Sequence, residues 1–150
     1  MRPLPQHQRG FSLIELLIVV AIISILVAIV IPYLAQAQQS ARSASAISSL
    51  RIILSSEASY RAINHTYGDM AALTNANLIS DPGIRAGRKE DYLFEITVGD
   101  AMLGDATQYY KATATPATEP ARWLHYFVDA SGVMRSQQGA PATTDSAPLD

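Results

Sequence analysis

The chain has 150 residues, which leaves room for one small globular domain beside an N-terminal membrane segment and disfavours a two-domain enzyme. Hydrophobic residues make up 49% of the sequence and crowd toward its N-terminal end, while the formal net charge is only -2. This near-neutral charge gives no electrostatic argument for binding nucleic acid or an acidic substrate. Because the sequence contains no cysteine, disulfides and thiolate metal sites are excluded.

Residues 1–10 form a short basic segment in front of a long apolar run. The segment carries Arg2 and Arg9, two prolines and no acidic residue. A basic stretch followed directly by an apolar run is typical of an export leader and not of a fold element. We therefore predict that residues 1–10 are a leader.

The apolar run, residues 13–31, is interrupted only by Glu15 and Ser24. As a helix it would span about 28 Å, which nearly matches the hydrocarbon core of a bilayer. No Lys or Arg follows the run before Arg42, so the positive-inside rule places the N-terminus in the cytoplasm. The sequence predicts a single-pass membrane protein whose C-terminal bulk lies across the membrane.

Two ordinary interpretations of this segment are open. Ala35-Gln36-Ala37 fits the small-x-small pattern of a secretory cleavage site, and cutting there would release a soluble protein that begins at Gln38. Against this, the apolar run is longer than that of a usual secretory signal and contains a carboxylate near its beginning. The second interpretation is a plain single-pass anchor, with Glu15 near the interface by chance.

A third interpretation rests on a stretch that begins just before the apolar run, Arg9-Gly10-Phe11-Ser12-Leu13-Ile14-Glu15-Leu16-Leu17. It closely resembles the processing site of type IV prepilins and type II secretion pseudopilins. The resemblance implies that a prepilin peptidase and N-methyltransferase cuts after Gly10 and methylates Phe11, the new N-terminus. It also implies that Glu15 takes part in assembly and that Pro32 bends the helix. The implied partners are identical subunits in a helical homopolymer, and an inner-membrane assembly platform with its cytoplasmic ATPase.

The chemistry of Glu15 agrees with this resemblance. A carboxylate within a membrane helix costs on the order of a few kcal/mol, so it usually has a partner. Cleavage after Gly10 frees the amine of Phe11, and an α-amino group with an ordinary pKa of about 8 is mostly protonated at neutral pH. In an assembly, the amine of a neighbouring subunit can pair with Glu15 and fix the axial register, because a buried charge pair gives specificity more reliably than stability.

Beyond the membrane segment, apolar residues at steps of three and four predict that the helix continues through residues 33–63. We expect residues 11–32 to be the membrane and filament-core helix, with a bend but no stop at Pro32. The bulkier part of the continuation, residues 47–54, is predicted to pack on the head. The alanine-rich part, residues 35–46, is predicted to pack against neighbouring subunits, because small residues let helices approach closely.

The head, residues 64–138, is predicted to be α+β. Asp69 is a candidate cap for one short helical turn that ends near Thr74. Residues 139–150, rich in Ala, Pro and Thr, are predicted to be an exposed, weakly ordered tail. The fold class is therefore a long N-terminal helix, membrane-spanning in its first half, packed on an antiparallel sheet of three to four strands. The strand-like segments are residues 92–98, 107–114, 124–129 and 133–136, the last two joined by a turn at 129–132.

The sequence offers no motif for catalysis, a cofactor or a metal. His7, His65 and His125 lie far apart without metal-ligand spacing, and neither a phosphate loop nor a serine-nucleophile elbow occurs. The aromatic cluster at residues 123–127 is predicted to pack the sheet, and the charged residues 85–91 to form a solvated loop. We therefore expect a structural protein and not an enzyme.

The resemblance leaves the kind of filament subunit open. The first expectation is a pilin of a surface type IV filament, stored in the inner membrane and extracellular once assembled. The alternative is a type II secretion pseudopilin in a periplasmic filament, although only the widely spaced Asp129, Asp145 and Asp150 stand where such proteins usually have an acidic calcium loop. A minor or tip pilin that binds DNA or a host surface would predict a larger head or a basic or aromatic patch. Many surface pilins also close a C-terminal loop with a disulfide, so a cysteine-free chain must hold that edge by other contacts.

Overall fold

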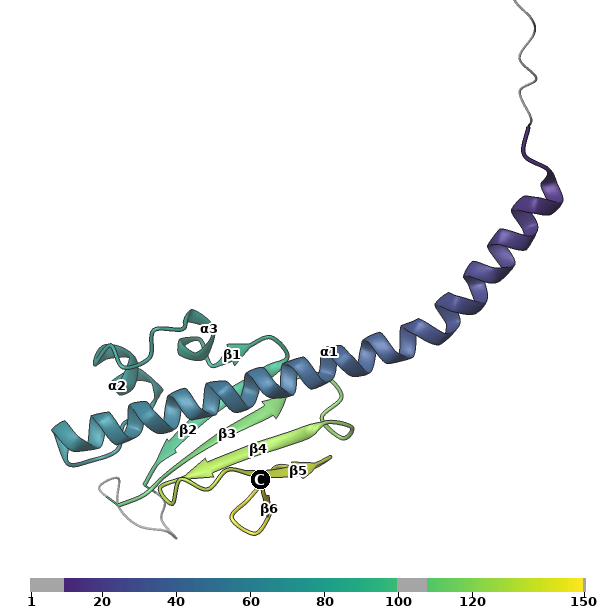
Figure 1. Cartoon of the computed structure of the whole chain (residues 1–150). Coiled ribbons are helices and arrows are strands. Elements are labelled where there is room, and N and C mark those ends of the chain that lie inside the picture. Colours follow the sequence, from purple (N-terminus) through teal and green to yellow (C-terminus); the bar gives the residue numbers. More distant parts are fainter. Residues whose placement is uncertain (1–9, 100–107, 150) are drawn as a thin grey trace, which may run out of the picture. The chain divides into compact units, whose positions relative to one another are not determined.

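The structure is a computed structural model of the whole chain and describes residues 10–99 and 108–149. Among these residues it contains one long helix, two short helices and six strands. They form two compact units, residues 1–39 and residues 40–150, and helix α1 (Leu13–Asn64) contributes to both (Figure 1). The predicted leader lies outside the described residues, except for Gly10.

The first unit consists mainly of the first part of α1. The helix starts at Leu13, with the amide of Leu16 donating to the carbonyl of Ser12 at 3.2 Å. Ser24 satisfies its hydroxyl within the helix by donating to the carbonyl of Val20 at 2.8 Å. Since α1 includes Pro32 in its interior, the helix neither begins nor ends there. The bend at Pro32 stays a prediction.

The second unit confirms the predicted α+β class. Its sheet has the order β1-β2-β3-β4-β5-β6, and every neighbouring pair is antiparallel. The predicted number of strands, three to four, was too low, because two strands of two residues each extend the sheet at its edges. Thr107, which was predicted to start a strand, lies outside the described residues. The strands are β1 (Arg88–Lys89), β2 (Tyr92–Val98), β3 (Tyr110–Pro116), β4 (Leu124–Asp129), β5 (Arg135–Gln138) and β6 (Ala147–Pro148).

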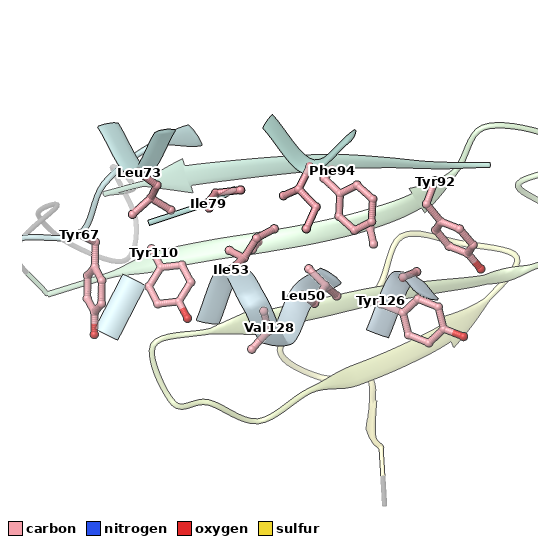
Figure 2. Packing of buried hydrophobic residues seen from close by; sticks show 14 residues of the cluster. Leu50, Ile53, Tyr67, Leu73, Ile79, Tyr92, Phe94, Tyr110, Tyr126 and Val128 are labelled. Carbon is pink, nitrogen blue, oxygen red and sulfur yellow. The ribbon is translucent and has the colours of Figure 1, made fainter. Parts of the chain in front are cut away.

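The hydrophobic core lies between one face of this sheet and the second part of α1 (Figure 2). Strands β2 and β3 point alternate residues into it, as expected for a half-buried sheet. Ala114 of β3 lies between Phe94 and Tyr126 of the two neighbouring strands, so large side chains flank a small one. From the helix, Leu50 and Ile53 belong to the same core and are fully buried.

The buried face of α1 differs in part from the predicted stripe. Complete burial of Ile53 confirms that residues 47–54 pack on the head. Ala46, at the end of the segment predicted to face neighbouring subunits, is also buried in this core, so that prediction is wrong for Ala46. Further along the helix the buried face continues through Ser56 and Glu57, two polar residues that a search for hydrophobic periodicity passes over.

Two isoleucines of α1 give a matched test of this packing. Ile53→Ala should lower the free energy of unfolding of the head by about 2–5 kcal/mol, because it leaves a cavity in a close-packed core. Ile63→Ala should change it by less than about 0.5 kcal/mol, since Ile63 is 73% exposed. Urea unfolding of the full chain in detergent, followed by near-UV circular dichroism, measures both. Equal losses for the two variants would contradict this account of the core.

Two short helices follow α1. Helix α2 (Met70–Asn75) is capped by Asp69, whose side chain accepts a hydrogen bond from the amide of Ala72 at 2.7 Å, which confirms the predicted cap. Helix α3 (Pro82–Arg85) is capped in the same way by Asp81.

The predicted solvated loop at residues 85–91 is more ordered than expected. It contains strand β1, and Lys89 of that strand donates to Asp81 Oδ2 at 2.7 Å. The same Asp81 carboxylate accepts the amides of Gly83 and Ile84. The bond from Lys89, together with these amides, lowers the pKa of Asp81. An alternation of charges had predicted solvation, whereas Lys89 and Asp91 of this segment pair with opposite charges outside it.

The segment after residue 138 corrects the prediction of an exposed, weakly ordered tail. Strand β6 pairs with β5, and the amide of Leu149 donates to the carbonyl of Met134 at 2.8 Å. Ser146 is buried, and its hydroxyl donates to Gln137 Oε1 at 2.7 Å. Small polar residues suggested disorder by composition, but here their hydrogen bonds order the segment against the sheet edge.

Two glycines with a positive φ, one in the β4–β5 turn and one at the start of the C-terminal segment, allow the cost of an added side chain to be compared. Gly132 closes the β4–β5 turn with a φ of 76°, and a Cβ there would meet nothing within 4 Å. Gly139 has a φ of 74°, but a Cβ there would lie 2.7 Å from the carbonyl oxygen of Ala121. Gly132→Ala should therefore cost about 1–2 kcal/mol of stability through backbone strain alone, and Gly139→Ala should cost more because the backbone must also shift. Urea unfolding compares them, and equal costs would contradict the prediction.

Candidate functional site

The predicted cleavage site lies at the start of the described chain. Gly10 is exposed, with nothing within 4 Å of a Cβ built on it, and Phe11 is 74% exposed. Regular helix begins only at Leu13. Exposed residues outside regular structure are where proteases act most readily. The bond between Gly10 and Phe11 is therefore accessible to an enzyme in this conformation.

Glu15 lies in the first turn of α1. A carboxylate in that position gains about 0.3–1 kcal/mol from the dipole of the helix, and the spacing of Ser12 and Glu15 fits a capping box. Neither side chain makes a hydrogen bond or an ion pair within the described part of the chain, so the capping box is not formed there. The carboxylate is left for a partner from outside these residues.

Large aliphatic side chains surround Glu15 on every side of α1. An 18-residue window of this helix has a mean hydropathy of 3.3, and none of its residues is buried. By length and composition, α1 is suited to one membrane crossing. Soluble monomers rarely leave so large an apolar surface uncovered. Such a surface is suited to lipid or to other apolar helices.

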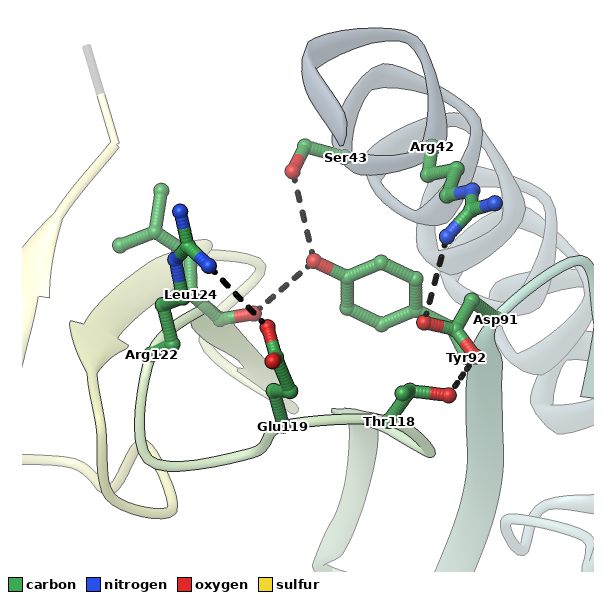
Figure 3. Close-up of polar contacts among 8 residues, drawn as sticks. All are labelled: Arg42, Ser43, Asp91, Tyr92, Thr118, Glu119, Arg122 and Leu124. Atoms are coloured by element: carbon green, nitrogen blue, oxygen red, sulfur yellow. Dashed lines mark hydrogen bonds and ion pairs between the residues drawn. The ribbon is translucent and has the colours of Figure 1, made fainter. Parts of the chain in front are cut away.

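In the second unit, an ion pair fastens α1 to the sheet (Figure 3). Arg42 Nη1 lies 3.4 Å from Asp91 Oδ2, next to the start of β2. The other oxygen of Asp91 accepts a hydrogen bond from the hydroxyl of Thr118 at 2.7 Å. Asp91 thus joins the helix to the loop between β3 and β4.

A buried tyrosine next to this ion pair makes a second link. The Tyr92 hydroxyl donates to the carbonyl of Leu124 at 3.0 Å and lies 3.3 Å from the hydroxyl of Ser43 (Figure 3). Burial raises the pKa of Tyr92, so the hydroxyl keeps its proton and remains a donor. These links hold the helix at a fixed place on the sheet. Sequence analysis missed them, because Ser43 and Tyr92 are 49 positions apart.

The structure brings together no metal or catalytic constellation in the part that it describes. Within residues 10–99 and 108–149, no three His, Cys, Asp or Glu side chains are grouped to hold a metal ion. His125 is buried in β4, where its Nε2 lies 2.9 Å from the carbonyl oxygen of Pro120. The aromatic residues Tyr126 and Phe127 are both buried, as predicted for sheet packing.

Comparison with known proteins adds two findings. A family described as the prokaryotic N-terminal methylation motif matches residues 5–31, which include Gly10, Phe11 and Glu15. The chain is also similar to the type IV wide pilus major component PilA4 of Thermus thermophilus, with 38% identity over 78 residues. That match covers 51% of this chain and 60% of the relative, so the chain spans less than two thirds of the relative's length. The chain thus joins the methylation motif, an apolar helix and an α+β head, and over about half of its length it is similar to a type IV pilus component.

Proposed function

We propose that this protein is the structural subunit of a type IV pilus-like surface filament. The precursor is stored in the inner membrane, loses its leader after Gly10 and polymerises through the first part of α1. The observation that carries this proposal is Glu15, a carboxylate without a partner in the described chain, on a helix whose apolar side chains are exposed. A plain membrane anchor gains little from such an acid, whereas a polymer of identical helices can supply its counter-ion.

The counter-ion in this proposal is the N-methylated amine of Phe11 from a neighbouring subunit. Phe11 and Glu15 are one helical turn apart, so two helices shifted by one turn would bring the amine of one beside the carboxylate of the other. Methylation to a secondary amine preserves the positive charge. The pair would set the axial position of each new subunit while the surrounding aliphatic side chains supply most of the buried area.

The proposed partners follow from these steps. A prepilin peptidase and N-methyltransferase processes the precursor, lipid covers α1 before assembly, and an inner-membrane platform with its cytoplasmic ATPase drives polymerisation. The similarity to a major pilus component supports an abundant subunit over a minor or tip pilin. A pseudopilin in a short periplasmic filament is the alternative, and its processing would be the same.

Intact mass and N-terminal sequencing of protein sheared from the cell surface test the proposal. Abundant sheared filaments that begin with N-methyl-Phe11 are the expected result. Phe11 as the N-terminus of protein found only in the cell envelope would favour a pseudopilin. A soluble protein that begins at Gln38 would overturn the proposal, because α1 would then be only a signal sequence.

A further inference from the structure

Glu57 is an ionisable residue buried in the head, on the face of α1 that packs against the sheet. Its exposed fraction is 0%. Its Oε2 accepts a hydrogen bond from the backbone amide of Gly68 at 3.0 Å. Its Oε1 is also buried but makes no hydrogen bond with any described residue. A buried carboxylate is stable when several donors or a cation surround it, and this one has a single donor.

No cation pairs with Glu57 among the described residues, because the nearby arginine is engaged elsewhere. Arg61, one turn further along α1, donates to the hydroxyl of Tyr67 at 2.7 Å and lies over its ring at 4.8 Å. Tyr110 of β3 stacks on Tyr67 with ring centroids 4.6 Å apart, and its buried hydroxyl has no partner among the described residues. Asp69, beyond Gly68, adds a second negative charge.

These surroundings favour the neutral form of the carboxyl. Burial, assisted by the charge of Asp69 and opposed by the hydrogen bond from Gly68, raises the pKa of Glu57 from 4.5 to about 7. The folded head therefore holds this proton more tightly than the unfolded chain. Its contribution to stability is complete below pH 4.5 and is lost as the pH rises through about 7.

The bond to Glu57 holds a short segment, residues 65–69, which joins α1 to α2 and is called the α1–α2 connection here. The connection approaches α1 closely at Gly68, where a Cβ would lie 3.1 Å from the Tyr60 ring and 3.2 Å from Ala72 Cβ. At its start, His65 has a left-handed φ of 58°, and its amide donates to the carbonyl of Arg61 at 2.9 Å. At Gly68 the hydrogen bond to Glu57 fixes the amide, whereas Tyr67 beside it is held by the bond from Arg61 and by burial in the core.

We propose that Glu57 is a proton-controlled latch on the α1–α2 connection. The neutral carboxyl holds the Gly68 amide against α1. The ionised carboxylate is the stronger acceptor for the Gly68 amide, but in this buried site it has one donor and a nearby Asp69, so it gains more from hydration in an opened state than from that single bond. Opening to water breaks the bond and frees the connection at Gly68. The strands beyond it keep their own ladder hydrogen bonds, so the opening is local to this end of the head. The pH around the subunit thereby decides whether the α1–α2 connection is held against α1.

Two measurements on the full chain in detergent micelles test the latch. With ¹³C-labelled glutamate, the carboxyl carbon of Glu57 should titrate with a midpoint near pH 7, well above the value of about 4.3 for a glutamate in a model peptide. In hydrogen exchange corrected for intrinsic rates, protection of the Gly68 amide should fall by about tenfold between pH 6 and pH 8. Protection of the Ala112 amide in β3 should stay constant.

Two variants complete the test. In Glu57→Gln the Gly68 amide should stay equally protected at both pH values, because the amide side chain cannot ionise. The control Glu95→Gln, at an exposed position of β2, should keep the pH dependence of the natural sequence. A Glu57 midpoint near 4.5, or the same loss of Gly68 protection in Glu57→Gln, would overturn the proposal. If Glu57→Gln does not fold, the titration of the natural sequence still decides.

Discussion

Replacing Glu15 by leucine is expected to abolish filament assembly and leave membrane insertion intact. The change removes a carboxylate from an apolar helix, so insertion becomes more favourable. Assembly loses one partner of the proposed charge pair, and breaking a buried pair in this way costs about 3–5 kcal/mol. A loss of that size weakens association of a subunit by more than about a hundredfold. Quantitation of sheared filaments and of membrane-bound subunit in the same cells measures both effects.

Ser24 provides the matched control for this experiment. It is the other polar residue of the apolar run, and its hydroxyl is already bonded to Val20 within the helix. Ser24→Leu therefore makes a similar change in polarity without removing a charge, and filaments should form. Glu15→Gln keeps the shape of the side chain and should still assemble poorly. Normal filament yield from Glu15→Leu would contradict the role given to the carboxylate.

The parts of the fold that the sequence predicted well are those encoded by neighbouring residues. The bounds of β2 and β4 match the predicted 92–98 and 124–129, because alternating apolar residues mark β2 and a run rich in aromatic and β-branched residues before a turn marks β4. The cap at Asp69 was predicted because an N-cap needs only a side chain and an amide three residues on. The predicted end of α1, at residue 63, was close to the observed Asn64.

The parts that the sequence did not reveal depend on residues far apart in the chain. Burial of Glu57 follows from its place opposite β3, which no local pattern shows. The C-terminal segment is held by Ser146, whose carbonyl accepts from Arg135 Nη1 at 2.9 Å and whose hydroxyl donates to Gln137. In this chain, which has no cysteine, these hydrogen bonds hold the C-terminal edge that many surface pilins close with a disulfide. Their partners are 11 and 9 positions away, beyond the range of turn patterns.

The candidate site divides in the same way. Gly10, Phe11 and Glu15 were predicted as site residues because they lie in one short motif, which matches a family model, and the structure adds that Glu15 has no partner in the described chain. The contacts that fix α1 on the sheet, such as Arg42 with Asp91, join distant segments and were missed. A site made of one short linear motif can be predicted from the sequence. A contact between distant segments can be identified only from the fold.

A Gly10→Val variant should stay at the mass of the precursor and form no filaments. A side chain at residue 10 would meet nothing within 4 Å, so the change should leave α1 and the head undisturbed. The need for glycine must then lie with the peptidase, which can approach a backbone without a Cβ more closely. Intact mass of the membrane fraction shows whether residues 1–10 are retained. Ser12→Ala, an exposed change on the other side of the bond, is the control and should be processed normally.

The two functional variants together test the charge pair from both of its ends. Retaining the leader keeps the Phe11 nitrogen in a peptide bond, so Gly10→Val removes the cation just as Glu15→Leu removes the anion. Both should therefore lose assembly by the same mechanism, but only Gly10→Val should retain the mass of the leader. Processing of Gly10→Val at the natural level would contradict the assigned cleavage site. Filaments built from the uncleaved Gly10→Val chain would instead show that Glu15 does not need the Phe11 amine.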